Sequence, residues 1–442
     1  MRKLKGLVRK VIEGLKQLLI WLTPGLGIKR YFLLTVLGTT LVGVGLAMFL
    51  LQIYRTAPDN WLLPYISYLS LRFLNRPLRV LIFGGVGILF IIAGLWGMNR
   101  TLLAPFRKPG HPVAETLAGH RRRERGPRVV VIGGGHGLAM QLRGLKAHTH
   151  NLTAVVTVAD DGGSSGQLRQ SLGILPPGDI RNCLAALSND EALLTQLFQY
   201  RFMDGGSLNG HSFGNLFIYA LSEVTGSFEE AIAESGKVLS VYGRVLPATL
   251  HDVRLVADKV VPDVPGEIRV TGESKIPKTS GRVRRLWLEP HDPPAFPKAI
   301  RKILEADLIV VGPGSLYTSI LPNLMVPDIS NALRASKALK IFIVNLATQP
   351  GETDRYSCGD HVRVVKEHVG DLVFDIVVCN DTFEGTLPEG VEWVRPEVDF
   401  TENYTVYCAD LADREKPWHH DSKKLARVLI DLLEERTGPL AS

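Results

Sequence analysis

Cysteine is scarce in this chain of 442 residues. The sequence has four cysteines, and no two of them are separated by the short spacing of a metal-binding or disulfide motif: Cys183, Cys358, Cys379 and Cys408. Closely spaced cysteines are typical of structural zinc sites and of small disulfide-stabilised domains. The pattern therefore argues against both kinds of site and agrees with a reducing compartment.

Charged residues are absent from two stretches near the N-terminus, Tyr31–Tyr54 and Val80–Asn99. A helix over either stretch is long enough to cross a hydrocarbon layer of about 30 Å. Arginine bounds both stretches, which argues against the alternative of two buried core helices. A cleaved signal peptide fits poorly, because the first stretch begins well inside the chain and no small-residue cleavage site follows it. The sequence predicts a helical transmembrane hairpin.

Lysine and arginine are concentrated outside this hairpin and are fewer in its connecting loop. By the positive-inside rule, both termini should face the cytoplasm, with the chain anchored in the plasma (inner) membrane by the two helices. We attribute much of the net charge of +7 to these flanks. It predicts attraction to anionic lipid, and we expect no nucleic-acid partner.

Three regions follow from these patterns. Residues 1–100 should hold the two spans, preceded by an amphipathic helix over residues 1–22 whose leucines share one face. A positive flank without a function of its own is the alternative for that helix. Residues 101–127, rich in proline, glycine and arginine, are typical of a basic tether. Residues 128–442 should form an α/β domain.

Short apolar, β-branched runs in this last region predict buried parallel strands at 129–132, 154–158, 308–311, 341–345 and 374–379. The stretch 244–297, rich in proline and charge, interrupts the pattern and should form a β-rich excursion. An amphipathic helix over 422–436 should close the chain. The fold class expected is therefore α/β, a Rossmann-like, mostly parallel sheet with helices on both faces.

The first candidate binding segment is the glycine run 133–138, between a strand and a helix. Backbone N–H groups in such a turn can approach a phosphate closely. The run fails the dinucleotide fingerprint because Leu138 stands at the last glycine position, and no Walker lysine is present. NAD binding and a tight turn without a ligand remain alternatives. The candidates are Gly134, Gly135, His136 and Gly137.

The second and third segments add acidic and basic groups. Two adjacent carboxylates followed by small residues suit a ribose, a hydroxyl or Mg²⁺, although a solvated turn is the alternative. The candidates there are Asp160, Asp161, Gly163, Ser164 and Ser165, the two aspartates being the candidate Mg²⁺ ligands. The run 176–182 offers Asp179, Arg181 and Asn182, with a simple helix cap as its alternative.

Three later segments are rich in hydroxyls and amides and precede or follow apolar elements. The segment 209–215 leads into an apolar helix and could bind an anion at the helix start. The other two follow likely strands, where open α/β sheets bind their ligands. The candidates are Asn209, His211, Ser212, Asn215, Gly312, Gly314, Ser315, Tyr317, Thr318, Thr348 and Gln349. Together the six segments predict one cleft along a sheet edge, suited to a phosphorylated, hydroxyl-rich ligand.

At this point the sequence resembles a known group. The motifs that carry the resemblance are GGGHGL, VTVADDGGSSG, PPGDIRN, GHSFGNL, TGESKIP, ADLIVVGPGSLYTSILPNLMVP and NLATQPGET. They are similar to the gluconeogenesis-factor (YvcK) group of the CofD-like family, over the chain from about residue 128 onward. His136 departs from that pattern, which usually has threonine there, so the contacts of the glycine loop should differ.

The resemblance implies a Rossmann-like fold and binding of UDP-sugars such as UDP-N-acetylglucosamine. It also implies roles in carbon partitioning and in cell-shape or envelope maintenance. The expected protein is a binding regulator. Its expected partners are an envelope-synthesis protein and further copies of the same chain. Other members are 2-phospho-L-lactate transferases, so a transferase is the alternative. Asp160 or Asp161 would then act as base or metal ligand, and Arg181 would stabilise the transferred phosphoryl group.

Overall fold

The computed structural model describes residues 28–56, 68, 71, 73–102, 123–189, 192–203, 206–261, 265–371, 374–397 and 404–438. The chain divides into two compact units, Met1–Arg121 and Arg122–Ser442, which we take one at a time. The amphipathic helix predicted over residues 1–22 and most of the predicted tether lie outside the described residues.

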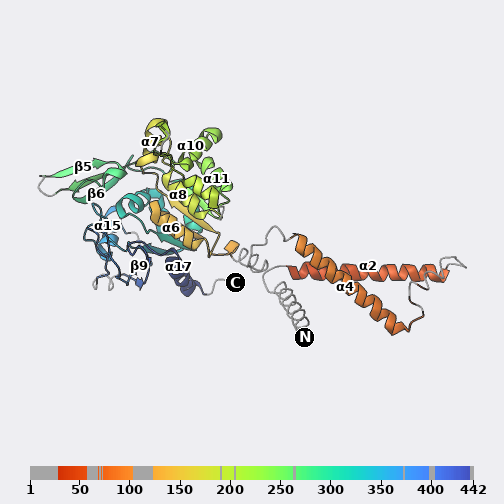
Figure 1. Cartoon of the computed structure of the whole chain (residues 1–442). Helices are drawn as coiled ribbons and strands as arrows, with labels where there is room; N and C mark the ends of the chain where they lie inside the picture. The colour runs from red at the N-terminus through yellow and green to blue at the C-terminus, as the bar shows by residue number, and fades with distance from the viewer. Residues whose placement is uncertain are drawn as a thin grey trace. The chain divides into compact units, whose positions relative to one another are not determined.

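The first unit contains two long helices (Figure 1), α2 over Ile28–Thr56 and α4 over Arg76–Leu102. They include the two uncharged stretches, so the helices predicted there are present. Within the described ranges, however, no helix combines the length and the apolar character that crossing a membrane requires. The predicted transmembrane hairpin is thus not supported by the structure.

A seven-stranded parallel sheet forms the centre of the second unit, in the order β10-β9-β8-β7-β1-β2-β3. Its strands are β1 Val129–Gly133, β2 Leu152–Val156, β3 Arg244–Pro247, β7 Leu308–Val311, β8 Leu339–Ile343, β9 Ile376–Asn380 and β10 Val406–Ala409. The central strands are buried along their whole length, as their uninterrupted apolar runs require.

Helices and short helical turns connect these strands and cover the sheet. They are α6 Gly135–Leu145, α7 Gly163–Leu172, α8 Gly178–Leu187, α9 Ala192–Gln199, η2 Gly206–Leu208, α10 Phe213–Thr225, α11 Phe228–Val238, η3 Glu273–Lys275, α12 Pro297–Glu305, η4 Leu316–Ile320, α13 Leu321–Leu324, α14 Pro327–Ala335, α15 Cys358–Val369 and α17 Ser422–Thr437. The α/β class and all five predicted strands are confirmed, as is the closing helix.

The interruption predicted after residue 244 is a small antiparallel sheet, ordered β5-β4-β6. It comprises β4 Arg254–Val260, β5 Glu267–Thr271 and β6 Arg282–Glu289. In Figure 1 its strands β5 and β6 project from one side of the unit. The same stretch also supplies β3 to the main sheet, which the sequence reading did not separate from the excursion.

A buried lysine ties the small sheet to the rest of the unit. Lys259, on β4, is 0% exposed. Its Nζ donates to the carbonyl oxygens of Ile276 at 2.9 Å, of Gly351 at 2.9 Å and of Thr279. An ammonium group has three N–H donors, so all of them are used. Lys259 therefore joins the segment after η3 to the loop after β8.

Candidate ligand-binding site

The strand order reverses direction between β1 and β7. From β1 the chain builds outward through β2 and β3, whereas β7, β8, β9 and β10 extend the sheet on the other side. Ligands of open parallel sheets bind at such a switch point, beyond the carboxyl ends of the two central strands. The glycine segment after β1 and the Gly312–Ser315 segment after β7 therefore lie where a ligand is expected.

These two segments are in backbone contact. A Cβ atom built on Gly137 would lie only 2.5 Å from the carbonyl oxygen of Pro313. Gly134 precedes α6 in an extended conformation, and Gly135 has φ +63°, which favours glycine. His136, in the first turn of α6, is exposed. The N-terminus of α6 thus presents backbone donors at the switch point, beside an exposed imidazole.

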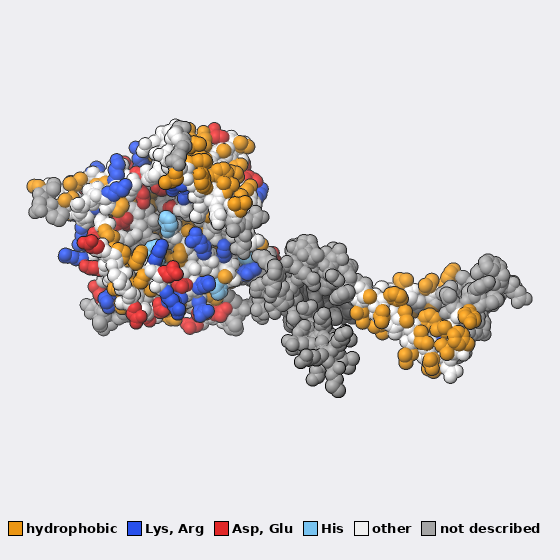
Figure 2. Space-filling view, in the orientation of Figure 1, with side chains coloured by type: hydrophobic (Ala, Val, Ile, Leu, Met, Phe, Trp, Pro, Cys, Tyr) orange, Lys and Arg blue, Asp and Glu red, His pale blue; other side chains and the backbone are white. Residues whose placement is uncertain are grey.

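Carboxylates surround this helix start. Asp160 Oδ1 accepts from the N–H of Gly162 and Asp161 Oδ1 from the N–H of Ser274, both at 2.8 Å. A Cβ atom on Gly134 would lie 2.7 Å from Asp179 Oδ2. Glu273, on η3, interacts electrostatically with all three aspartates. We call Asp160, Asp161, Asp179 and Glu273 the acidic cluster; acidic and histidine side chains are visible in the hollowed centre of this unit (Figure 2).

Burial governs the protonation of the acidic cluster. It raises the pKa of Asp179 to about 6, and the nearby charge of Asp160 adds to the effect. The same two causes, with burial the larger, raise the pKa of Glu273 to about 8. At neutral pH Glu273 therefore retains its proton, because so many negative charges cannot coexist in a partly dry site.

The acidic cluster bears on the expected Mg²⁺ site. Among the residues that the structure describes, no three Asp, Glu, His or Cys side chains form a ready-made metal site. Asp160 and Asp161 also each accept a backbone N–H. Magnesium commonly binds through one or two carboxylates plus water and phosphate oxygens. These two residues fit that mode, in which the ligand itself completes the coordination.

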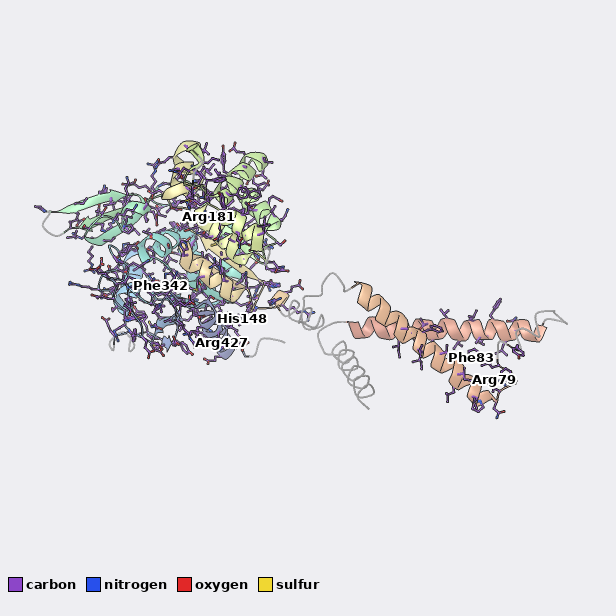
Figure 3. All side chains as sticks on the ribbon, viewed as in Figure 1. Arg79, Phe83, His148, Arg181, Phe342 and Arg427 are labelled. Atoms are coloured by element: carbon purple, nitrogen blue, oxygen red, sulfur yellow. The ribbon has the colours of Figure 1, made fainter. Side chains whose placement is uncertain are left out.

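Arg181, on α8, lies beneath the upper helices of the unit in Figure 3 and interacts electrostatically with Asp179 and Asp160. Its guanidinium donates to Ser212 Oγ and, at 2.9 Å, to Asn182 Oδ1. Burial lowers its pKa, with Arg201 contributing, whereas Asp179 and Asp160 oppose the shift. Its Nε is buried without a partner in the described structure. One donor of this buried cation is therefore not satisfied within the described structure.

A second polar group joins the starts of α7 and α10. Ser164 Oγ lies 3.1 Å from His211 Nδ1 and accepts from Asn215 Nδ2 at 3.0 Å. Ser212 caps α10 by accepting from the N–H of Asn215 at 3.3 Å. The structure thus brings these four predicted residues together. Asn209, by contrast, is exposed in the loop before them.

The loops after β7 and β8 form a third polar group. Ser315 Oγ donates to Glu352, and Thr318 Oγ1 lies 2.6 Å from Ser315 Oγ and 3.3 Å from Glu352 Oε1. Asn345 Nδ2 donates to the Gly314 carbonyl at 2.9 Å and to Gln349 Oε1 at 3.2 Å. These bonds fix the two loops to each other beside the switch point.

Two predicted residues make internal contacts instead. Tyr317 is buried, and its hydroxyl lies 2.7 Å from that of Tyr356. Thr348 Oγ1 accepts from the N–H of Glu392 at 2.9 Å. Both hydroxyls are thus already used within the fold, and ligand contact by either residue stays a prediction.

The sequence reading did not select Glu273 and Glu352 as site residues. Both carboxyls have a raised pKa caused mainly by burial, and each interacts electrostatically with other groups of the site. Both lie in motifs that carry the family resemblance: Glu273 in TGESKIP and Glu352 in NLATQPGET. The motifs were therefore the available signal, but only the folded chain brings these distant segments to Asp160.

The raised pKa of Glu273 predicts that the stability of the fold depends on pH. Because its pKa is raised from 4.5 to about 8, the folded chain binds this proton more tightly than the unfolded chain. The resulting stabilisation is complete below the unfolded pKa and is lost as the pH rises through the folded value. Glu273→Gln should leave the melting temperature nearly unchanged at pH 5 and raise it relative to wild type at pH 9. Glu435→Gln, on the exposed side of α17, is the control, and parallel melting profiles for wild type and Glu273→Gln would contradict the assignment.

The sequence of this chain is similar to those of several known proteins. The family model described as 2-phospho-L-lactate transferase CofD matches residues 129–436. A protein from Nostoc sp. is 48% identical over 372 residues, covering 81% of this chain and 78% of that protein. One from Clostridium acetobutylicum is 38% identical and covers 94% of this chain and 92% of its own length. The Gluconeogenesis factor of Bacillus subtilis is 44% identical, covering 70% and 99%.

The fold of this chain is also similar to that of a solved structure. The crystal structure of a member of the UPF0052 family from Bacillus halodurans superposes with a TM-score of 0.64 at 40% identity. It covers 69% of this chain and 99% of that one. The two chains therefore share the α/β fold in which the switch-point site is built.

Proposed function

This chain belongs to the CofD-like family, with relatives named gluconeogenesis factor, and we propose that it is a UDP-sugar-binding regulatory protein. The observation that carries the proposal is the contact between two glycine segments at the switch point of the sheet. A helix N-terminus there suits a diphosphate. The acidic cluster and the neighbouring hydroxyls suit the hydroxyl groups of a ribose and a sugar.

Each group of the site has a place in this proposal. Gly134, Gly135, His136 and Gly137 would bind the diphosphate. Asp160 and Asp161 would bind ribose, sugar or a ligand-held Mg²⁺. The group around His211 would contact sugar or phosphate, and the loops after β7 and β8 would enclose the remainder. UDP-N-acetylglucosamine is the ligand we favour, on the resemblance of the motifs to the YvcK group.

Calorimetric titration of the full chain tests the proposal. UDP-N-acetylglucosamine is added with and without Mg²⁺, NAD⁺ and GDP serve as comparison ligands, and nucleotide release is followed in the same samples. We expect saturable binding of the UDP-sugar, weaker binding of NAD⁺, and no release. Absence of UDP-sugar binding at millimolar concentration would refute it. Asp160→Asn should alter the Mg²⁺ dependence of the affinity, whereas Glu435→Gln should not.

A transferase is the second candidate, favoured by the family description and by the buried carboxyls. Asp179, with a pKa of about 6, could exchange a proton near neutral pH. Asp160 or Asp161 would act as base or metal ligand for an attacking hydroxyl, and Arg181 would stabilise charge on the transferred phosphoryl group. Sustained release of a nucleoside monophosphate in the titration above would put this function first.

Further proposals rest on the sequence alone. Occupancy by the UDP-sugar would report precursor supply to an envelope-synthesis partner, linking carbon partitioning to cell shape, and the chain would form homo-oligomers. The basic flanks of residues 1–127 would hold it at the inner membrane. Cell fractionation of the full chain tests the location: recovery in the supernatant at low salt would count against it.

A further inference from the structure

A basic pocket lies on a different part of the second unit from the switch-point site. It has a volume of about 610 Å³ and lies between β6, the start and body of α14, and the end of α15. None of the residues predicted for the switch-point site lines it. Its volume lies within the usual range of small-molecule sites.

Cations without a carboxylate partner line this pocket. Within the described parts of the chain, Arg285 and Arg334 form no ion pair. Arg334 donates to Asn331 Oδ1 at 3.1 Å and to the Val369 carbonyl, and Arg285 lies over the ring of Trp287 at 5.7 Å. Both guanidiniums line the pocket and lack a carboxylate to offset their charge.

Two acidic residues also line the pocket. Glu367 Oε1 lies 4.0 Å from Arg363 Nε, and Asp292 Oδ1 lies 3.8 Å from His291 Nδ1, a contact that is an ion pair only when the imidazole is protonated. Arg284, the remaining lining arginine, pairs with Glu267. The three lining arginines therefore outnumber the two lining carboxylates, and Arg285 and Arg334 are the two without an ion-pair partner among the described residues.

Neutral groups complete the pocket. Trp287 is partly exposed, with the Arg269 guanidinium over its ring at 4.9 Å, and the apolar residues Leu324 and Met325 also line the pocket. His368 Nδ1 lies 2.8 Å from the Val364 carbonyl, so Nδ1 carries the proton and Nε2 is left as an acceptor. Burial lowers the pKa of His368, with Arg285 contributing, so the ring is neutral at neutral pH. Such an acceptor suits a hydroxyl group.

We propose that this pocket is a second ligand site, for the phosphate ester of a small hydroxylated metabolite. Arg285 and Arg334 bind the phosphate through charge-assisted hydrogen bonds. His368 Nε2 accepts from a hydroxyl, and the partly buried Met325 side chain contacts the carbon skeleton. The site shares no lining residue with the switch-point site, so both ligands can be bound at the same time.

One side chain of the pocket also contacts a residue of the switch-point loops. The His368 ring packs edge-on against Tyr317, with 6.1 Å between centroids, and Tyr317 belongs to the segment that follows Gly314. A ligand that orders His368 therefore contacts, through one side chain, the element that carries Ser315 and Thr318.

Glucose 6-phosphate is the probe for this site, with glucose and sulfate as comparison compounds. It is titrated into the full chain by calorimetry, with and without saturating UDP-N-acetylglucosamine. We expect saturable binding under both conditions, and weaker binding of glucose and of sulfate. Arg285→Gln and Arg334→Gln, made separately in case one fails to fold, should each lower the affinity by about tenfold or more, the usual effect of losing a charge-assisted contact.

Arg254→Gln is the matched control, an exposed arginine at the start of β4 that does not line the pocket. It should bind glucose 6-phosphate as the wild type does. The proposal is overturned if glucose 6-phosphate does not bind, if sulfate binds equally well, or if both pocket variants retain full affinity. Displacement by UDP-N-acetylglucosamine would assign the binding to the switch-point site and would also overturn it.

Discussion

Gly137→Ala is expected to destabilise the fold and to weaken ligand binding together. The added methyl group would lie 2.5 Å from the Pro313 oxygen, 3.0 Å from the Pro313 carbonyl carbon and 3.2 Å from the Gly314 Cα. All three are backbone atoms, so no side chain can rotate away. Relief requires α6 to separate from the loop after β7. Such overpacking should lower the free energy of unfolding by about 2–3 kcal/mol.

The same separation should lower the affinity for UDP-N-acetylglucosamine by about tenfold or more, because the donors at the switch point lose their geometry. Gly236→Ala in α11 is the matched control. Its methyl group would meet only side chains, at 3.7 and 3.8 Å, and alanine favours a helix by up to about 1 kcal/mol over glycine. Denaturant unfolding measures both variants. A Gly137→Ala protein as stable as wild type would show that the two loops are not in contact.

Lys259→Met is expected to be the most destabilising substitution in the small sheet. Three backbone carbonyls, those of Ile276, Thr279 and Gly351, would lose their donor while remaining beneath the sheet. An unsatisfied buried polar group costs about 1–3 kcal/mol, so a loss of about 3 kcal/mol or more in the free energy of unfolding is expected. Lys278→Met, an exposed lysine in the adjacent segment, should change it little.

Losing the hydrogen bonds of Lys259 should also increase local opening of the chain at the ligand site. The residues that Lys259 holds flank Glu273 and Glu352, so amide hydrogen exchange should accelerate across residues 271–280 and 349–354. Lys259→Arg should restore part of the stability but not the exchange protection, because a planar guanidinium cannot reproduce three tetrahedral bonds. Unchanged exchange in Lys259→Met would mean that the lysine stabilises β4 without positioning the site.

The parts of the fold that the sequence predicted are those with strong local signals. β1 and β7 are uninterrupted Val and Ile runs, and the leucines of α17 recur at helical spacing. The edge strands were missed for a physical reason. β3 is four residues long and ends in Pro247, and β10 has a half-exposed pattern with Tyr407 and Cys408, so neither resembles a buried strand.

The candidate site also contains residues that local sequence patterns predicted and residues that they did not. Three local patterns indicated site residues in the sequence: the glycine turn at Gly134, the paired carboxylates at Asp160, and the polar run that contains Asp179. Glu273 follows a strand of the excursion and Glu352 follows β8, and the interactions of Glu273 with Asp160 and with Glu352 depend on the position of the small sheet. Lys259 fixes that sheet through hydrogen bonds to residues far away in the sequence. Local sequence patterns do not predict contacts of this kind.

Asp179 has a further consequence for how the switch-point site would respond to acidity. The Gly135 N–H, one of the donors that a phosphate would use, donates to its carboxylate. Asp179 is therefore a built-in competitor of the anion for the start of α6. Since its pKa is about 6, mild acidification neutralises the competitor and frees the donor. Occupancy and proton uptake are then linked, so the affinity of the switch-point site for an anion would rise as the pH falls through about 6.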